Sequence, residues 1–345
     1  MNFLKVSLLC MCLAGNLMAQ EVLTVPESSQ MAGVTQRIGL TDIAINYHSP
    51  LAKGRLIWGE VVPFGEVWRA GANENTTISF STDVKIEGKP LPAGTYGLHM
   101  IPRKDKWTII FSKNYESWGS YFYKEAEDAL RVEVTPEAAS MQEWLSFRFT
   151  DLKASSAKAQ LNWEKIGVGF LIQVNVPDAV VANMRKELRG LAGFTWEGLW
   201  QAADYCFRNN IYPEDAMKWN EQSIAIRETF NNLNLKSKML AAKGMTKEVA
   251  ALNSKALQLA NEEQLNAYGY QLLGDKKTDE ALAVFKMNVQ KHPDSWNVYD
   301  SLAETMELKG DHKGAVTNYK IALKKAPDGQ KKRIEDIIKK MEKKG

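Results

Sequence analysis

Ala281-Leu282-Ala283-Val284-Phe285 is matched in pattern 34 residues later by Ala315-Val316-Thr317-Asn318-Tyr319. Each segment begins with a small residue and ends with an aromatic one, near the start of an amphipathic helical stretch. A proline closes each stretch, Pro293 in the first and Pro327 in the second. Two earlier alanines extend the series: Ala216 and Ala250. Successive alanines are then 34, 31 and 34 residues apart, which predicts stacked helix–turn–helix units.

Counting back from each proline recovers the usual positions of a tetratricopeptide repeat. In the third unit these positions hold Leu265, Tyr268, Gly269, Leu272, Ala281 and Phe285, and in the fourth Tyr299, Leu302, Ala303, Met306, Ala315, Tyr319 and Ala322. Both units closely resemble tetratricopeptide repeats, whereas the first two match mainly at their alanines. Small residues are needed where two helices cross closely, and large ones fill the space beside them. Such repeats form contact surfaces, so the expected partner is a protein or peptide.

The helical segments follow from the same pattern. A first helix is expected from Asp178 to Leu188, with Gly190 as its stop. The paired helices are then expected at 196–207 and 213–229, 233–242 and 247–259, 263–273 and 278–291, and 296–309 and 313–325. The repeat domain as a whole is placed at residues 190–345.

The last segment, Gln330 to Lys344, has isoleucines and a methionine on one face and lysines elsewhere. A polar outer face over an apolar seam is typical of the helix that caps a repeat array. Binding to an anionic lipid surface is the alternative for a basic amphipathic helix. The apolar face lacks an aromatic anchor, which favours the cap.

The N-terminal half is expected to be all-β. From Thr41 to Val176 short alternating runs are separated by turns, as in Ile43-Ala44-Ile45-Asn46-Tyr47 and at Glu87-Gly88-Lys89-Pro90. Many short strands at regular spacing, with no long helix between them, predict an antiparallel β-sandwich or barrel. The fold class is therefore a two-domain α+β protein: a β-sandwich at residues 35–176 followed by a tetratricopeptide-like solenoid.

Residues 1–19 have the features of a secretory signal peptide. Lys5 supplies the positive charge, an apolar run follows from Val6 to Ala14, and Ala19 provides the small residue before a cut at Gln20. Cys10 and Cys12 lie within the apolar run and lack the small residues that precede a lipidated cysteine. We therefore expect a periplasmic or secreted protein that does not span the membrane.

Removal of that segment leaves Cys206 as the only cysteine, so an internal disulfide is excluded. Its apolar neighbours predict a small buried hydrophobe rather than a nucleophile. The net charge of +3 is nearly balanced and argues against a dedicated nucleic-acid binder.

Two motifs of the β domain carry a family resemblance. Trp68-Arg69-Ala70-Gly71-Ala72-Asn73-Glu74-Asn75-Thr76-Thr77 is the first and Leu91-Pro92-Ala93-Gly94-Thr95-Tyr96-Gly97-Leu98 is the second. Together with the run from Ser49 to Gly59 they resemble a secreted domain family of unknown function from Bacteroidota-type bacteria. The resemblance covers roughly residues 35 to 175. It implies a fold and a compartment, and it implies no reaction.

The first motif and the run before it also supply the candidate ligand-binding residues: Arg55, Trp58, Trp68, Arg69, Asn73 and Glu74. Flat aromatic faces beside a few polar groups are typical of a sugar- or peptide-binding groove. The structural alternative is that Arg69 and Glu74 pair with each other or with turn carbonyls, and that both tryptophans plug the ends of the sandwich. Convergence of Arg69, Asn73 and Glu74 in one pocket would distinguish the two.

Signals for catalysis are sparse. No phosphate-binding loop, dinucleotide fingerprint or nucleophile elbow is present. His48 and His99 could form a metal site with Glu74, but no ligand spacing supports it. Glu125 and Asp128 lie in a polar segment of mixed charge and are expected in a solvated loop. The alternative, a pair of glycosidase carboxylates, would need a cleft. No cofactor, metal or catalytic residue is assigned.

Two functional hypotheses follow. The first is an exported, non-catalytic binding or scaffold protein that contacts a protein or peptide through its helical repeats. The alternative is an enzyme or carbohydrate-binding module with its ligand at the motif Trp68 to Glu74.

Overall fold

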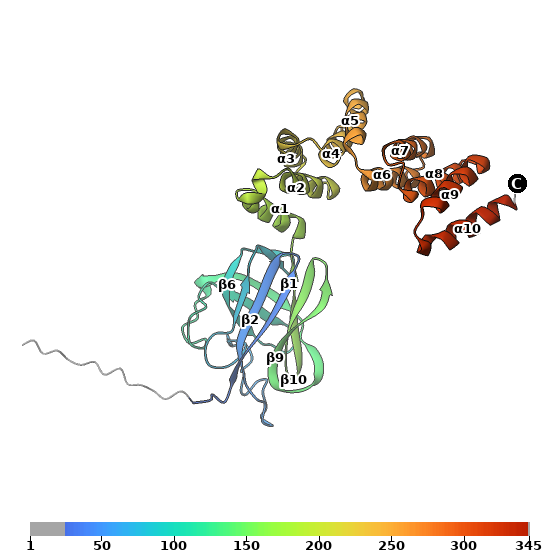
Figure 1. Ribbon diagram of the computed structural model, residues 1–345. Helices are drawn as coiled ribbons and strands as arrows, with labels where there is room; N and C mark the ends of the chain where they lie inside the picture. The colour runs from blue at the N-terminus through green and yellow to red at the C-terminus, as the bar shows by residue number, and fades with distance from the viewer. Residues whose placement is uncertain (1–24, 344–345) are drawn as a thin grey trace, which may run out of the picture. The chain divides into compact units, whose positions relative to one another are not determined.

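The computed structural model describes residues 25–343, so the signal peptide expected at residues 1–19 lies outside the described residues. Contacts divide the chain into two compact units, one ending at Val176 and the other beginning at Pro177. The first is built of strands and the second of helices, and we call them the β unit and the helical unit (Figure 1). Among residues 25–343, no helix combines the length and apolarity needed to cross a bilayer.

The larger of two antiparallel sheets in the β unit has six strands in the spatial order β1-β2-β3-β6-β7-β8. They are β1 (Gln30–Ile38), β2 (Thr41–Ser49), β3 (Thr77–Phe80), β6 (Gly94–Ile101), β7 (Trp107–Ser112) and β8 (Asp128–Val134). In β2, Ile43, Ile45 and Tyr47 are buried while the residues between them are more exposed. This alternation places the isoleucines on the core side of the sheet.

The smaller sheet has four strands in the order β5-β4-β10-β9. They are β5 (Lys89–Leu91), β4 (Val84–Ile86), β10 (Ser156–Gln173) and β9 (Glu137–Lys153). The turn between β4 and β5 has left-handed backbone at Glu87 (φ 48°) and Gly88 (φ 78°), as a tight hairpin requires. Side chains of both sheets form one hydrophobic core, which includes Ile45, Ile78, Phe111, Phe147 and Phe170.

Two features of the β unit differ from the sequence-based expectation. The alternating runs at residues 159–163 and 168–172 predict two separate short strands, but both belong to the single long strand β10. An irregular pairing with β9 near Glu164, whose φ is 54°, interrupts the alternation and made one strand resemble two. Strand β1 begins before the expected start of the β domain. It is an edge strand with little buried surface, so its hydrophobic pattern is weak.

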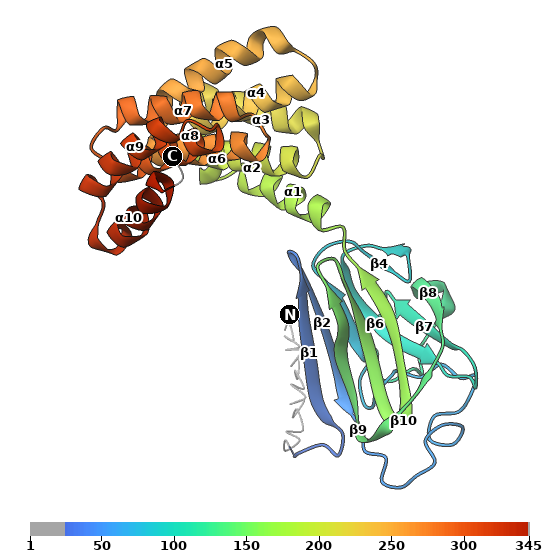
Figure 2. The same ribbon diagram turned by 90° about the vertical axis from the view of Figure 1, so that its right-hand side faces the viewer.

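The helical unit begins with α1 (Val176–Glu187), followed by four pairs of helices that pack against each other in sequence order (Figure 2). The pairs are α2 (Trp196–Arg208) with α3 (Pro213–Ile226), α4 (Phe230–Ala242) with α5 (Thr246–Leu259), α6 (Glu262–Gly274) with α7 (Thr278–Lys291), and α8 (Trp296–Leu308) with α9 (His312–Lys325). The pairing and most helix ends agree with the sequence-based prediction.

Small residues lie at the expected crossings. A Cβ atom on Gly269 of α6 would lie 2.5 Å from the ring of Phe285 in α7, so the two helices approach closely only because this position is glycine. In the next pair Ala303, Ala315 and Tyr319 are likewise buried. Packing alone therefore explains the repeat pattern in these two pairs.

Ala250 was predicted at such a crossing, and this is wrong. Ala250 is exposed, whereas Val249 holds the fourth position of α5, which Ala216, Ala281 and Ala315 hold in α3, α7 and α9. The boundary between the first two pairs also differs: α3 ends at Ile226, and Thr229 accepts a hydrogen bond from the backbone of Asn232 as the N-cap of α4. The Asn232 side chain accepts a hydrogen bond from the Thr229 backbone N–H and completes a capping box.

The last helix, α10 (Asp328–Glu342), packs against α9. Its buried residues are Ile334, Ile338 and Met341, which join the cluster that contains Tyr319. The apolar face is thus occupied by the repeat array, as expected of a capping helix.

Candidate functional site

The candidate residues all lie on the long connection from residue 50 to residue 76, between β2 and β3. A connection of this length without regular structure is unusual in a compact domain, and such segments commonly carry function. It is held against other elements by short backbone pairings. Trp68 and Met100 exchange two hydrogen bonds of 2.8 Å, which attach the connection to β6. The Ala52 amide donates to the Glu143 carbonyl at 2.8 Å and attaches it to β9.

Four tryptophans lie together here: Trp58 and Trp68 of the connection, Trp107 of β7 and Trp163 of β10. The ring of Trp58 is 4.8 Å from that of Trp107, and 5.8 Å from those of Trp68 and Trp163. Trp68 and Trp163 stack with centroids 6.0 Å apart and an interplanar angle of 18°. We call these four residues the tryptophan cluster. Trp68 also donates its indole N–H to the Gly71 carbonyl at 3.1 Å, which closes the turn that follows it.

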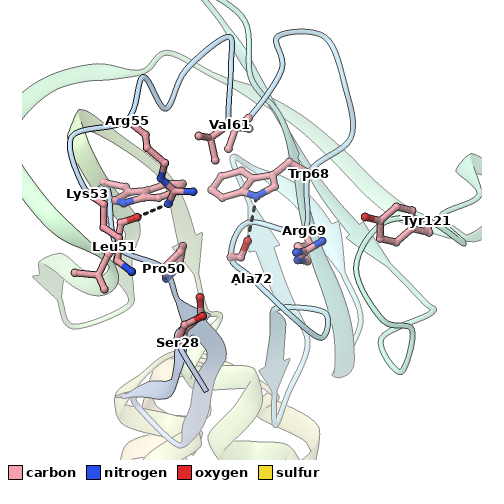
Figure 3. A pocket seen from close by; sticks show the side chains of 14 residues that line it. Ser28, Pro50, Leu51, Lys53, Arg55, Val61, Trp68, Arg69, Ala72 and Tyr121 are labelled. Carbon is pink, nitrogen blue, oxygen red and sulfur yellow. Dashed lines mark hydrogen bonds between the residues drawn. The ribbon is translucent and has the colours of Figure 1, made fainter. Parts of the chain in front are cut away.

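A pocket of about 510 Å³ opens over the tryptophan cluster. Its lining includes Lys53, Arg55, Trp68, Arg69, Tyr121 and Trp163. Figure 3 shows Lys53 and Arg55 on one side of the Trp68 ring, and Arg69 and Tyr121 on the other. The volume falls within the range of small-molecule sites. Of the six predicted residues the structure therefore brings three to this pocket: Arg55, Trp68 and Arg69.

The backbone around the pocket is strained at three non-glycine residues. Lys53, Ala70 and Asn73 adopt φ angles of 51°, 52° and 55°, in the left-handed region that favours glycine. Each such residue costs on the order of 1 kcal/mol and persists only where its surroundings impose it. Such strain clusters at binding and catalytic sites.

The two arginines are held differently. Arg55 donates to two turn carbonyls, at 2.6 Å to Leu51 and 3.1 Å to Ala52, so part of its role is to brace the loop. Arg69 lies with its guanidinium 5.4 Å from the centroid of the Trp118 ring. Its Nε is buried and has no hydrogen-bond partner. Burial lowers the pKa of Arg69, against the opposing influence of Tyr121 and Glu74.

Asn73 and Glu74 are not part of the pocket lining. Asn73 donates to the Glu27 carboxylate at 2.6 Å, and Glu74 lies 3.3 Å from the Nδ1 of His48. Glu27 approaches the other ring nitrogen of His48, also at 3.3 Å. These two predicted residues therefore serve a neighbouring polar cluster that fastens the segment before β1 to the motif. Trp58 lies in the tryptophan cluster and does not line the pocket either.

The metal hypothesis is not supported. His99 contacts Ser120 (Nδ1 to Oγ, 3.0 Å) and the ring of Tyr123, whereas His48 contacts Glu27 and Glu74. Within the described part of the chain, no group of three or more histidine, cysteine, aspartate or glutamate residues is arranged to hold a metal ion. Cys206 is buried as expected, and burial raises the pKa of its thiol.

The expectation of a solvated loop at Glu125 and Asp128 is correct only for Glu125. The Asp128 side chain is 8% exposed, because it starts β8 and accepts hydrogen bonds from Tyr123 at 2.7 Å and from Arg131 at 2.5 Å. Burial, together with the bond to Asp128, raises the pKa of Tyr123 to about 12. Burial also lowers the pKa of His99 to about 4. His99, Tyr123, Asp128 and Arg131 thus form a network near the sheet edge in which burial disfavours the charged form of the histidine. None of the four lines the pocket.

Three lining residues were not among the predicted six: Lys53, Tyr121 and Trp163. Lys53 lies in the run from Ser49 to Gly59, which carries part of the family resemblance, and Tyr121 lies in an aromatic stretch from Trp118 to Tyr123. Trp163 lies on β10 and is about 100 positions away from the motif. No local pattern marks it as a neighbour of Trp68.

A protein-family model matches most of the β unit. Residues 29–172 match the model of a family described as protein of unknown function (DUF2911). The expected resemblance of this region to a family of unknown function is therefore confirmed. Comparison with curated proteins gives no match.

The helical unit is similar to solved structures of tetratricopeptide proteins. YrrB, described as a TPR protein with an unusual peptide-binding site, shares 18% identity over 45% of this chain and 80% of its own, with a TM-score of 0.28. MamA shares 16% identity over 44% of this chain and 88% of its own, with a TM-score of 0.31. TTC0263, a thermophilic TPR protein from Thermus thermophilus, shares 16% identity over 48% of this chain and 90% of its own, with a TM-score of 0.30.

Proposed function

We propose that this chain is an exported, non-catalytic binding protein whose helical repeats contact a protein or peptide partner. The observation that carries the proposal is one continuous face made by the first helices of successive pairs, α4, α6 and α8. We call it the first-helix face. In this proposal the β unit is a β-sandwich that holds a second ligand.

Polar side chains connect the helices of the first-helix face. Lys238 of α4 donates to Gln271 of α6 at 3.2 Å, and Gln264 of α6 donates to Asn231 of α4 at 3.3 Å. Tyr270 of α6 donates to Glu304 of α8 at 2.7 Å. The spacing of the repeats thus aligns polar groups from separate pairs along one surface. An extended peptide needs a surface of this kind, with donors and acceptors at regular intervals.

Two buried acceptors on this face are not used within the described chain. The Oδ1 atoms of Asn266 and Asp300 are buried and have no hydrogen-bond partner. Asp300 receives a bond from Arg333 of α10 at 2.8 Å through its other oxygen only. Buried acceptors are costly to leave unpaired, so we expect water or the N–H groups of a bound peptide to pair with them. Tyr270 adds an aromatic ring that is 38% exposed beside them.

A photo-reactive amino acid placed at two positions tests the first-helix face. Gln271 lies on α6 within the face, and Lys286 is an exposed residue of the second helix α7. Peptides are first selected from a displayed random library on the mature chain. We expect these peptides to cross-link at position 271 and not at position 286. Equal cross-linking at both positions, or a library that yields no binder, would reject the proposed surface.

Export is a proposal of its own and rests on residues 1–19. N-terminal sequencing of the protein after expression in a bacterium with a secretion pathway is expected to give Gln20 as the first residue. Retention of Met1 on the isolated protein would refute it.

A second candidate function, favoured by the pocket over the tryptophan cluster, is ligand binding by the β unit as an enzyme or a carbohydrate-binding module. Three of the predicted residues line this pocket and the backbone around it is strained. Asn73 and Glu74 lie outside, so the charged groups available to a ligand are Lys53, Arg55 and Arg69. Binding is therefore better supported than catalysis.

A further inference from the structure

We infer that the pocket over the tryptophan cluster binds an acidic saccharide, a hydroxylated ring that carries a carboxylate or sulfate group. This inference rests on the second candidate function, that the β unit binds a ligand in this pocket, and it names the chemical class of that ligand. Four observations lead to it: unpaired cations, engaged carboxylates, a desolvated arginine and an exposed aromatic stack.

The charged groups of the pocket all have one sign. Lys53, Arg55 and Arg69 line it, and no aspartate or glutamate is among the described lining residues. Within residues 25–343, none of these three side chains has an ion-pair partner. Cations that converge on a concave surface without counter-charges raise the local potential and attract anions.

The nearest carboxylates are held by other donors. Glu143 accepts from the backbone amide of Lys53 at 2.8 Å, Glu27 accepts from Asn73, and Glu74 lies against His48. These contacts hold the three carboxylates at the rim, and none of them is among the residues that line the pocket. The charged side chains that line the pocket are therefore all cations, and the anionic group of a ligand would pair with them there.

Arg69 is the group best prepared for an anion. Its guanidinium is half-buried and interacts with Tyr121 and Glu74, while its Nε has no hydrogen-bond partner. A planar donor that is already desolvated binds a carboxylate or sulfate with little further loss of hydration. Arg55, in contrast, donates two of its N–H groups to turn carbonyls. We therefore assign Arg69 as the principal anion contact, with Lys53 as a point charge on the other side of Trp68 (Figure 3).

An aromatic stack beside Arg69 provides the contact for a ring. Trp118 and Tyr121 lie parallel, 5.8 Å apart with an angle of 8°, and are 52% and 77% exposed. Large flat faces left in water beside a polar pocket mark a binding surface. The hydroxyls of Ser28 and Ser29 add small donors and acceptors to the lining. A ligand with an apolar ring face, several hydroxyls and one negative group satisfies all of these at once.

The test is titration calorimetry of the full mature chain with three probes: an oligogalacturonide, a neutral malto-oligosaccharide and inorganic sulfate. We expect the oligogalacturonide to bind with an affinity that falls as salt rises. Tyr121→Ala and Lys53→Gln change exposed side chains and should each weaken binding about five- to tenfold. Lys104→Gln removes an exposed lysine from the β6–β7 turn, outside the pocket, and should leave binding unchanged.

The outcomes separate the ligand class from the site itself. Equal binding of the neutral oligosaccharide, weakened by Tyr121→Ala but not by Lys53→Gln, would overturn the acidic class and leave a ligand site in place. Equal weakening by Lys53→Gln and Lys104→Gln would show general charge attraction and overturn the assignment to this pocket. If sulfate alone binds as tightly as the oligogalacturonide, the sugar ring contributes nothing to binding, and the saccharide class is overturned. No binding of any probe up to about 1 mM would reject both the class and the site.

Discussion

The helical unit and the β unit bury comparable cores through contacts of very different range. In the helical unit Gly269 meets Phe285, 16 residues later, and Ala303 and Tyr319 repeat this spacing in the next pair. In the β unit Trp58 meets Trp163, 105 residues later. Local contacts leave a period in the sequence, whereas distant contacts leave none. A surface built from repeated helix pairs can therefore be predicted from the sequence, whereas a pocket built from residues far apart in the chain cannot.

The same difference separates the two proposed binding functions. The first-helix face distributes single polar groups over several helix pairs, so no single residue is expected to dominate partner binding. The pocket of the β unit concentrates three cations and two tryptophans around one volume. A single substitution in the pocket should therefore weaken ligand binding strongly.

Removal of the Phe285 ring is expected to have the largest effect, and to affect the helical unit. The ring is fully buried between α6 and α7, so Phe285→Ala leaves a cavity and lowers the free energy of unfolding by about 4 kcal/mol. Amide hydrogen exchange of α6 and α7 measures the loss, with the β unit as internal reference. Phe194→Ala, at a ring that is 80% exposed, serves as the control and should change little. An equal loss of protection in both units would contradict the expectation that the Phe285 ring stabilises the helical unit alone.

Acid should act on the β unit through His99. The folded pKa is about 4 and the ordinary value is 6.5, because burial disfavours the charged ring. Between these values the unfolded chain binds a proton that the folded chain does not. The free energy of unfolding therefore falls as pH decreases from 6.5 to about 4, by about 3 kcal/mol in total.

Exchange of β6 and β7 amides measured between pH 4 and pH 7, corrected for the intrinsic rate, follows this loss. His99→Gln removes the titration and should flatten the dependence in the β unit. The matched control is His312→Gln, at an exposed position of α9, which should leave it unchanged. A pH dependence that survives in His99→Gln would assign the acid sensitivity to other groups.

Loss of one cap should give the smallest effect and sharpen the comparison within the helical unit. Thr229→Ala removes the side chain that caps α4, and we expect a loss of about 1 kcal/mol in the stability of the helical unit. Lys277→Ala is the control, because the N-cap position of α7 makes no side-chain capping bond. Thermal unfolding followed by circular dichroism at 222 nm compares the two, since this is a helix signal. A larger loss in Lys277→Ala would contradict the assigned cap.

The fold could be predicted furthest where one period controls burial. Ala281, Phe285, Ala315 and Tyr319 are buried as their spacing requires. The prediction failed at Ala250, because an irregular unit moved the fourth position of α5 to Val249. In the β unit the bulge near Glu164 made one strand resemble two, since an irregular residue shifts the alternation.

The pocket could be predicted only in part. Arg55, Trp68 and Arg69 stand out by residue type on an unusual motif, and the structure brings them together. Asn73 and Glu74 stand on the same motif, but left-handed backbone at Asn73 accompanies a change of direction, and both residues lie against Glu27 and His48 instead. Trp163 arrives from β10, and strand pairing over that distance is not encoded in any local pattern.

The tryptophan cluster gives this protein a built-in optical probe. Trp68 and Trp163 form part of the pocket wall, and their rings stack 6.0 Å apart. Indoles this close couple their electronic transitions, so the near-ultraviolet circular dichroism of the β unit should contain a signal of the pair. A ligand that enters the pocket touches both rings and must perturb that signal. Occupancy of the pocket can therefore be followed by light alone, in the unlabelled protein.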